Sequence, residues 1–131
     1  MIKLFTKYKI IFYFINLCLL ILYLFPGSLI GWLLYNDLRI QPQITKDFII
    51  SSNHFYAFAI ISIIGFFTYE ELKEIRLLCF YLITMSIILE ILHIIIPKRS
   101  FQWPDLFGNI FGVVVVIIIY NFIKKNEFFQ K

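Results

Sequence analysis

Charged side chains are scarce in this chain of 131 residues. Asp, Glu, Lys and Arg together make up 15% of the sequence, whereas 61% of the residues are hydrophobic. Soluble globular chains carry about 25% charged and roughly 45–50% apolar residues. A soluble domain of this length has too little interior to cover so much apolar surface. The scarcity of charge therefore excludes an ordinary soluble domain and indicates an integral membrane protein.

Cysteines are few, and nucleic-acid-binding motifs are absent. Cys18 and Cys79 lie inside apolar runs without a Cys-x-x-Cys spacing, so we expect buried thiols and no disulfide framework. The net charge of +4 does not indicate nucleic-acid binding, because the basic residues flank apolar runs and form no stripe. Lys and Arg in this arrangement orient a membrane protein instead.

Four apolar stretches are long enough, or nearly so, to cross a membrane as helices. They cover approximately residues 8–25, 53–69, 77–96 and 105–123 of a single domain, 1–131. About 20 apolar residues span the hydrocarbon core of a bilayer. The first stretch resembles a signal peptide, but Phe25 stands where cleavage needs a small residue, so we expect an uncleaved anchor. The sequence thus predicts an all-α integral membrane protein, a bundle of four transmembrane helices.

Basic residues in the loops predict the orientation of this bundle. With the N-terminus inside, eight basic residues fall in inner segments and four in outer segments. The inner residues are Lys3, Lys7, Lys9, Lys73, Arg76, Lys124, Lys125 and Lys131, and the outer ones are Arg39, Lys46, Lys98 and Arg99. This bias predicts that both termini are cytoplasmic. Loops 26–52 and 97–105 then face outward, with the short apolar segment 28–35 at the membrane interface.

Polar residues gather at the junction of the third and fourth stretches, where a lipid-embedded chain should avoid them. Glu90 and His93 share one helical face because they are three residues apart. Glu90 precedes Ile96 by six residues, so we expect it about 9 Å below the end of the third helix. Asp105 and Asn109 share a face of the fourth helix in the same way.

Gly108 and Gly112 lie on that same face as a Gly-x-x-x-Gly pair, which allows another helix to approach closely. We expect the pair to serve packing within the bundle. His54 begins the second span, and Arg99 lies in the loop between the third and fourth spans. Six candidate ligand-binding residues therefore converge at the outer end of the bundle: His54, Glu90, His93, Arg99, Asp105 and Asn109.

The same residues also have purely structural interpretations. Glu90 and Arg99 are candidates for an ion pair between a helix and its own loop. Asp105 is suited to a helix N-terminus, where a negative charge complements the dipole. Asn109 is suited to a hydrogen bond between helices, and His54 to the membrane interface.

Metal ions and anionic head groups are the two kinds of ligand that such residues could bind. No metal site is expected, because the histidines and carboxylates lack His-x-x-x-His spacing and no cysteines accompany them. An anionic head group is better supported, since Lys98, Arg99 and the start of the fourth helix are suited to bind anions.

Three short motifs resemble those of the VanZ-like family of small bacterial membrane proteins. "NHFYAF" supplies His54 and Phe55, "EILHIIIPKR" supplies Glu90, Pro97 and Arg99, and "DLFGNIFG" supplies Asp105, Asn109 and Gly112. The resemblance covers about residues 52–112. Two positions depart from it: His93 stands where the family usually has Gln, and Asn53 stands where an acidic–basic pair often precedes the His.

The resemblance implies a multi-pass protein of the bacterial inner (plasma) membrane and leaves the biochemical activity open. We expect a non-catalytic cell-envelope protein, surrounded by membrane lipids, whose outward-facing polar pocket binds a lipid or cell-wall-precursor head group without a cofactor. One alternative is a membrane-embedded enzyme acting on such a head group, with Glu90 or His54 as general base. A purely structural or partner-binding protein is another. A third alternative is a proton-coupled carrier that uses Glu90 and His93, but four short spans leave little room for alternating access.

Overall fold

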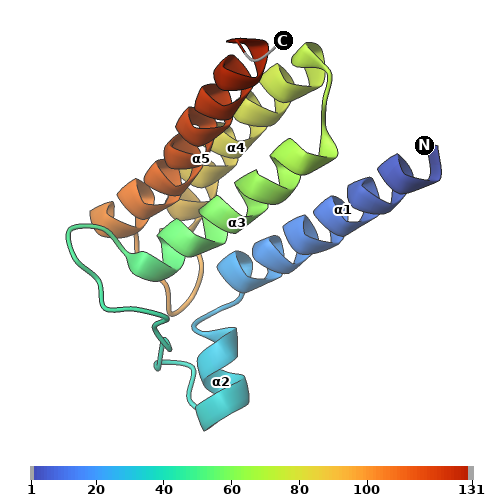
Figure 1. Cartoon of the computed structure of the whole chain (residues 1–131). Coiled ribbons are helices and arrows are strands. Elements are labelled where there is room, and N and C mark those ends of the chain that lie inside the picture. Colours follow the sequence, from blue (N-terminus) through green and yellow to red (C-terminus); the bar gives the residue numbers. More distant parts are fainter. Residues whose placement is uncertain (1, 130–131) are drawn as a thin grey trace.

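The computed structural model describes residues 2–129, and their backbone forms five helices and no strand (Figure 1). The helices are α1 (Ile2–Leu24), α2 (Leu29–Tyr35), α3 (Ser52–Thr68), α4 (Leu72–Leu92) and α5 (Trp103–Phe129). The all-helical class predicted from the sequence is therefore confirmed.

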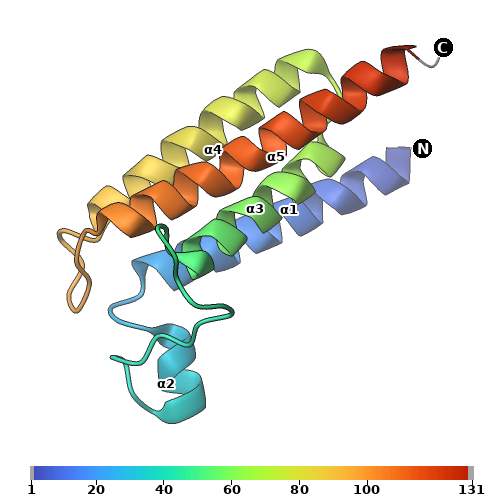
Figure 2. The ribbon, with the colours of Figure 1, turned by 60° about the vertical axis from the view of Figure 1, so that its left-hand side comes forward.

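The long helices α1, α3, α4 and α5 run side by side, and the short α2 turns away from them at one end (Figures 1 and 2). Helix α3 packs most extensively against α5, while α1 packs mainly against α3. Apolar residues at helical spacing fill the centre, with Phe58, Ile61, Leu82, Leu89 and Val113 almost fully buried. The start of α1 and the end of α5 lie at the end of the bundle opposite α2 and the loops 36–51 and 93–102 (Figure 2).

Two of the described helices, α4 and α5, are long and apolar enough to cross a membrane. Helices α1 and α2 qualify together as a third span, although they are bent by 82° at the break between them. Helix α3 is apolar but has only 17 residues, slightly fewer than a typical span. The chain therefore has two to three membrane-capable helices, which indicates a membrane protein.

Helix α4 differs at both ends from the predicted stretch 77–96. It begins at Leu72, so most of the charged segment before residue 77 is helical. It ends at Leu92, and residues 93–96 form tight turns closed by hydrogen bonds between residues three or four positions apart. Pro97 contributes to this end, because it has no N–H to donate to the His93 carbonyl and its ring would clash with that carbonyl in a helix. Glu90 consequently lies two residues before the end of the helix. The predicted position, six residues before that end, was wrong.

The segment from Pro26 to Leu38 follows α1, contains α2 and folds back on itself, so that its two ends meet. Gly27 adopts φ +88°, a left-handed conformation that favours glycine. The Ser28 side chain caps α2 by accepting a hydrogen bond from the Gly31 N–H at 2.9 Å, and the Ser28 N–H donates to the Leu38 carbonyl at 2.8 Å. A Cβ on Gly31 would collide with the Ile40 carbonyl, so the chain after α2 packs directly on this helix.

Segment 42–51 is fastened to the start of α3 by side chains. The Asn53 side-chain oxygen accepts from the Ile44 N–H at 3.0 Å, and its amide donates to the Pro42 carbonyl at 2.7 Å. The Asp47 carboxylate accepts from the Ser52 N–H at 2.8 Å, which satisfies one free donor of the first helical turn. These bonds give Asn53 a local structural role beside His54.

Candidate functional site

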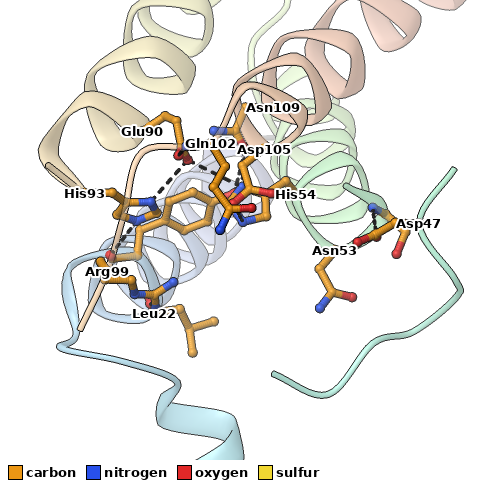
Figure 3. Close-up of polar contacts among 12 residues, drawn as sticks. Leu22, Asp47, Asn53, His54, Glu90, His93, Arg99, Gln102, Asp105 and Asn109 are labelled. Atoms are coloured by element: carbon orange, nitrogen blue, oxygen red, sulfur yellow. Dashed lines mark hydrogen bonds and ion pairs between the residues drawn. The ribbon is translucent and has the colours of Figure 1, made fainter. Parts of the chain in front are cut away.

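Five of the six predicted site residues meet where α3, α4 and α5 come together near α2 (Figure 3). His54 comes from the first turn of α3, Glu90 from the last turn of α4, and Asp105 and Asn109 from the first two turns of α5. His93 caps the end of α4. Glu90, His93 and Asn109 are at most 1% exposed, and His54 is 8% exposed. Such burial makes every polar contact within this cluster matter for stability.

Tyr23 of α1 joins this cluster, although no sequence pattern singles it out. Its hydroxyl donates to the Asn109 side-chain oxygen at 2.6 Å and lies 3.1 Å from Nδ1 of His54. Its backbone carbonyl lies 3.1 Å from Nε2 of His93, and the two rings stack with centroids 5.8 Å apart. Tyr23 therefore connects α1 to all three other long helices at the site.

The hydrogen-bond network determines which His54 nitrogen carries a proton. The Asn109 amide donates to the Ser86 carbonyl at 3.1 Å, so its oxygen faces Tyr23 and His54 as an acceptor. Because the Tyr23 hydroxyl already donates to this oxygen, Nδ1 of His54, 3.0 Å from the same oxygen, must donate as well. The other ring nitrogen, Nε2, is thereby directed at Oδ2 of Asp105, 3.5 Å away.

Glu90 and His93 form a second contact between a carboxylate and an imidazole. Nε2 of His93 faces the Tyr23 carbonyl, which can only accept, so Nε2 carries a proton. Nδ1 of His93 then faces Oε2 of Glu90 at 3.2 Å. The other carboxylate oxygen, Oε1, accepts from the Gln102 N–H at 2.9 Å. Glu90 thus holds the loop 93–102 against the end of α4.

Arg99 does not form the ion pair with Glu90 that the sequence suggested. Its guanidinium instead donates from Nε to the Phe25 carbonyl at 3.2 Å and from Nη2 to the Leu22 carbonyl at 2.8 Å. These are carbonyls at the C-terminal end of α1, which lack intrahelical partners because Pro26 ends the helix. Burial lowers the pKa of the Arg99 guanidinium, and the nearby carboxylates oppose this shift. Arg99 therefore lies beside the cluster and ties its loop to α1.

Gly108 and Gly112 lie at the closest contact between α5 and α3. A Cβ on Gly108 would be 2.7 Å from the Ser51 carbonyl oxygen, and one on Gly112 would be 2.5 Å from the Phe55 carbonyl oxygen. The missing side chains let the two backbones approach, as a Gly-x-x-x-Gly pair allows. This approach brings His54 and Asn109 within hydrogen-bonding distance.

Two cavities flank the cluster. The first, of about 270 Å³, is polar and lies between the turn before α2, the chain that follows α2, loop 93–102 and the start of α5. Its lining includes Arg39, His93, Lys98, Arg99 and Asp105. The second, of about 260 Å³, is more apolar and reaches Tyr23 and His54 from between α1, α2 and α3. The first cavity therefore reaches His93 and Asp105, and the second reaches Tyr23 and His54.

Comparison of the chain with protein-family models, with curated proteins and with solved structures found no match.

Proposed function

We propose that this protein is a VanZ-like component of the bacterial plasma membrane that binds an anionic head group of a lipid or cell-wall precursor. The observation that carries this proposal is the 270 Å³ cavity with three cationic side chains, Arg39, Lys98 and Arg99, in its wall. Phosphate groups are bound in proteins by such clusters of Arg and Lys. The activity proposed is binding, without chemical conversion of the ligand.

Arg99 is prepared for this role by its bonds to α1. The two carbonyls of Leu22 and Phe25 occupy two of the five N–H donors of the guanidinium, which leaves three for a ligand. Because the side chain is already held in place, little conformational entropy is lost when an anion binds. Its position next to lipid-facing helices favours a ligand that remains anchored in the bilayer.

Lys98 supports the proposal through its backbone. It adopts φ +61°, a left-handed conformation that is uncommon for a residue with a side chain and unfavourable by roughly 1–2 kcal/mol. Such strain often occurs at ligand-binding positions. Here it accompanies the turn that brings Lys98 and Arg99 to the same cavity.

The proposed arrangement in the membrane has four spans, with α3 as the second and the bent pair of α1 and α2 as the first, and both termini in the cytoplasm. The cationic cavity then opens on the outer face. The excess of basic residues at the opposite end supports this orientation. A reporter fused after Lys131 should be active only in the cytoplasm, and activity on the outer face would contradict the topology.

Native mass spectrometry of the purified full chain tests the ligand. We expect a phosphate-bearing lipid or lipid-linked precursor to remain bound to the wild type, with its mass identifying which. Arg39→Gln and Arg99→Gln should lose this ligand, whereas Lys73→Gln, which removes an exposed cation at the start of α4, should retain it. Equal retention by all folded variants would refute the proposal. Conversion of the bound ligand during incubation would identify an enzyme instead of a binding protein.

A further inference from the structure

Three side chains of the cluster have the arrangement of metal ligands. His54, Glu90 and Asp105 each offer one ligand atom, and these atoms all lie within 4.8 Å of one another. The three residues come from three different helices, α3, α4 and α5, so the packing of the bundle holds them together. His54 and Glu90 are buried and Asp105 is half-buried.

Glu90 provides an independent indication that a cation belongs here. Its side chain is fully buried, and its atom Oε2 accepts no hydrogen bond from any residue between 2 and 129. Nδ1 of His93, 3.2 Å away, and Nδ1 of His54, 3.9 Å away, lie within ion-pair distance of this oxygen without donating a hydrogen bond to it. A buried carboxylate oxygen that accepts no hydrogen bond is unfavourable, because its lost hydration is not compensated. A cation bound at Oε2 would remove this cost.

His54 is oriented as metal-binding histidines are. Its Nδ1–H donates to the Asn109 side-chain oxygen, so in the neutral imidazole the lone pair of Nε2 points towards Oδ2 of Asp105. A ligating histidine almost always donates its other N–H to such an acceptor, which fixes the ring and its tautomer. The distance of 3.5 Å between Nε2 and Oδ2 is long for a charge-assisted hydrogen bond. It is close to the roughly 3.3 Å that separates two ligands of a tetrahedral zinc ion.

We propose that His54, Glu90 and Asp105 bind one divalent transition-metal ion of the zinc class. Nitrogen and carboxylate oxygen are ligands that Zn²⁺ accepts at about 2.0–2.2 Å, and two carboxylates neutralise its charge. Asp105 also lines the 270 Å³ cavity, which provides an entry path and leaves a fourth ligand position facing the proposed anion site. This inference replaces the expectation from sequence spacing that the cluster holds no metal.

Metal binding is measured on the purified full chain in detergent, after removal of any polyhistidine tag. The wild type should retain about one equivalent of Zn²⁺ after desalting, as counted by elemental mass spectrometry. Co²⁺ in place of Zn²⁺ should give the visible absorption of a four- or five-coordinate ion. Added Zn²⁺ should raise the thermal unfolding temperature. These measurements do not depend on the head group, so failure of either proposal leaves the other standing.

The variants Asp105→Asn and Glu90→Gln test the ligands, and Glu70→Gln, an exposed carboxylate at the other end of the bundle, is the matched control. Loss of a ligand should weaken Zn²⁺ binding by more than the roughly 10- to 100-fold that is typical of losing an outer partner. Glu70→Gln should bind as the wild type does. If buried Glu90→Gln fails to fold, half-buried Asp105→Asn decides. A folded Asp105→Asn variant with wild-type affinity, or a wild type without stoichiometric Zn²⁺, overturns the proposal.

Discussion

Replacing Gly112 with alanine tests whether close contact between α3 and α5 assembles the polar cluster. The new methyl carbon would lie 2.5 Å from the Phe55 carbonyl oxygen and 3.0 Å from the Ala59 nitrogen. Both are backbone atoms of α3, so no side-chain rotation can relieve the overlap. The two helices must instead move apart near Asn109, which lies one turn earlier on the same face as Gly112.

The expected loss of stability is the difference between two effects. Alanine stabilises a helix by roughly 0.5–1 kcal/mol relative to glycine. Overpacking of a close contact costs about 1–3 kcal/mol. We therefore expect Gly112→Ala to lower the free energy of unfolding by about 1–2 kcal/mol. Separation of α3 and α5 should also lengthen the 3.0 Å contact between His54 and Asn109.

Gly65→Ala is the matched control, because Gly65 is also a buried glycine within a helix. A methyl group there would meet the flexible ends of Leu78 at 2.9 Å and the Phe12 ring at 3.1 Å. Side chains can yield at little cost, so we expect a change within about 0.5 kcal/mol of zero. Unfolding in mixed micelles with increasing sodium dodecyl sulfate, followed by circular dichroism, measures both values. A Gly112→Ala variant as stable as Gly65→Ala would refute this explanation of the contact.

Three further substitutions test individual parts of the site. Tyr23→Phe removes the hydroxyl between Asn109 and His54 and should cost about 1 kcal/mol in the same unfolding assay, since His54 still donates to the amide oxygen; an unchanged stability would contradict the bond. His93→Gln should retain more thermal stability than His93→Ala, because an amide N–H can replace the imidazole donor to the Tyr23 carbonyl; equal melting temperatures would contradict this. Asn53→Ala should increase hydrogen exchange in residues 42–51 while α4 and α5 stay protected, as mass spectrometry of peptides can show; unchanged exchange there would contradict the fastening role.

Composition and helical periodicity were sufficient to predict the class of the protein and most of the cluster. The low charge content indicated a membrane protein, and spacings of three and four residues placed Glu90 beside His93 and Asp105 beside Asn109. These predictions depend only on helix geometry, which the sequence encodes locally. Whether the chain crosses the membrane four times stays a prediction, because α3 is short and α1 is continued only by the sharply bent α2.

The contributions of Tyr23 and Arg99 could not be predicted in this way. Tyr23 lies in an apolar, aromatic-rich run where nothing local distinguishes it from a lipid-facing tyrosine. Its position three residues before Pro26 was the available signal, since a helix end places side chains near the interface. Arg99 was assigned to Glu90 through charge alone, whereas the free carbonyls at the end of α1 provide its partners. Such pairings depend on how distant segments meet, which local patterns do not encode.

The contacts of Tyr23 with three later residues have a consequence for the order in which the protein is built. Tyr23 leaves the ribosome early, but its partners His54, His93 and Asn109 follow 31, 70 and 86 residues later. The last turn of α1 therefore lacks these partners until the final helix has been made. A chain interrupted before α5 therefore leaves both the Tyr23 hydroxyl and Nδ1 of His54 without the Asn109 oxygen.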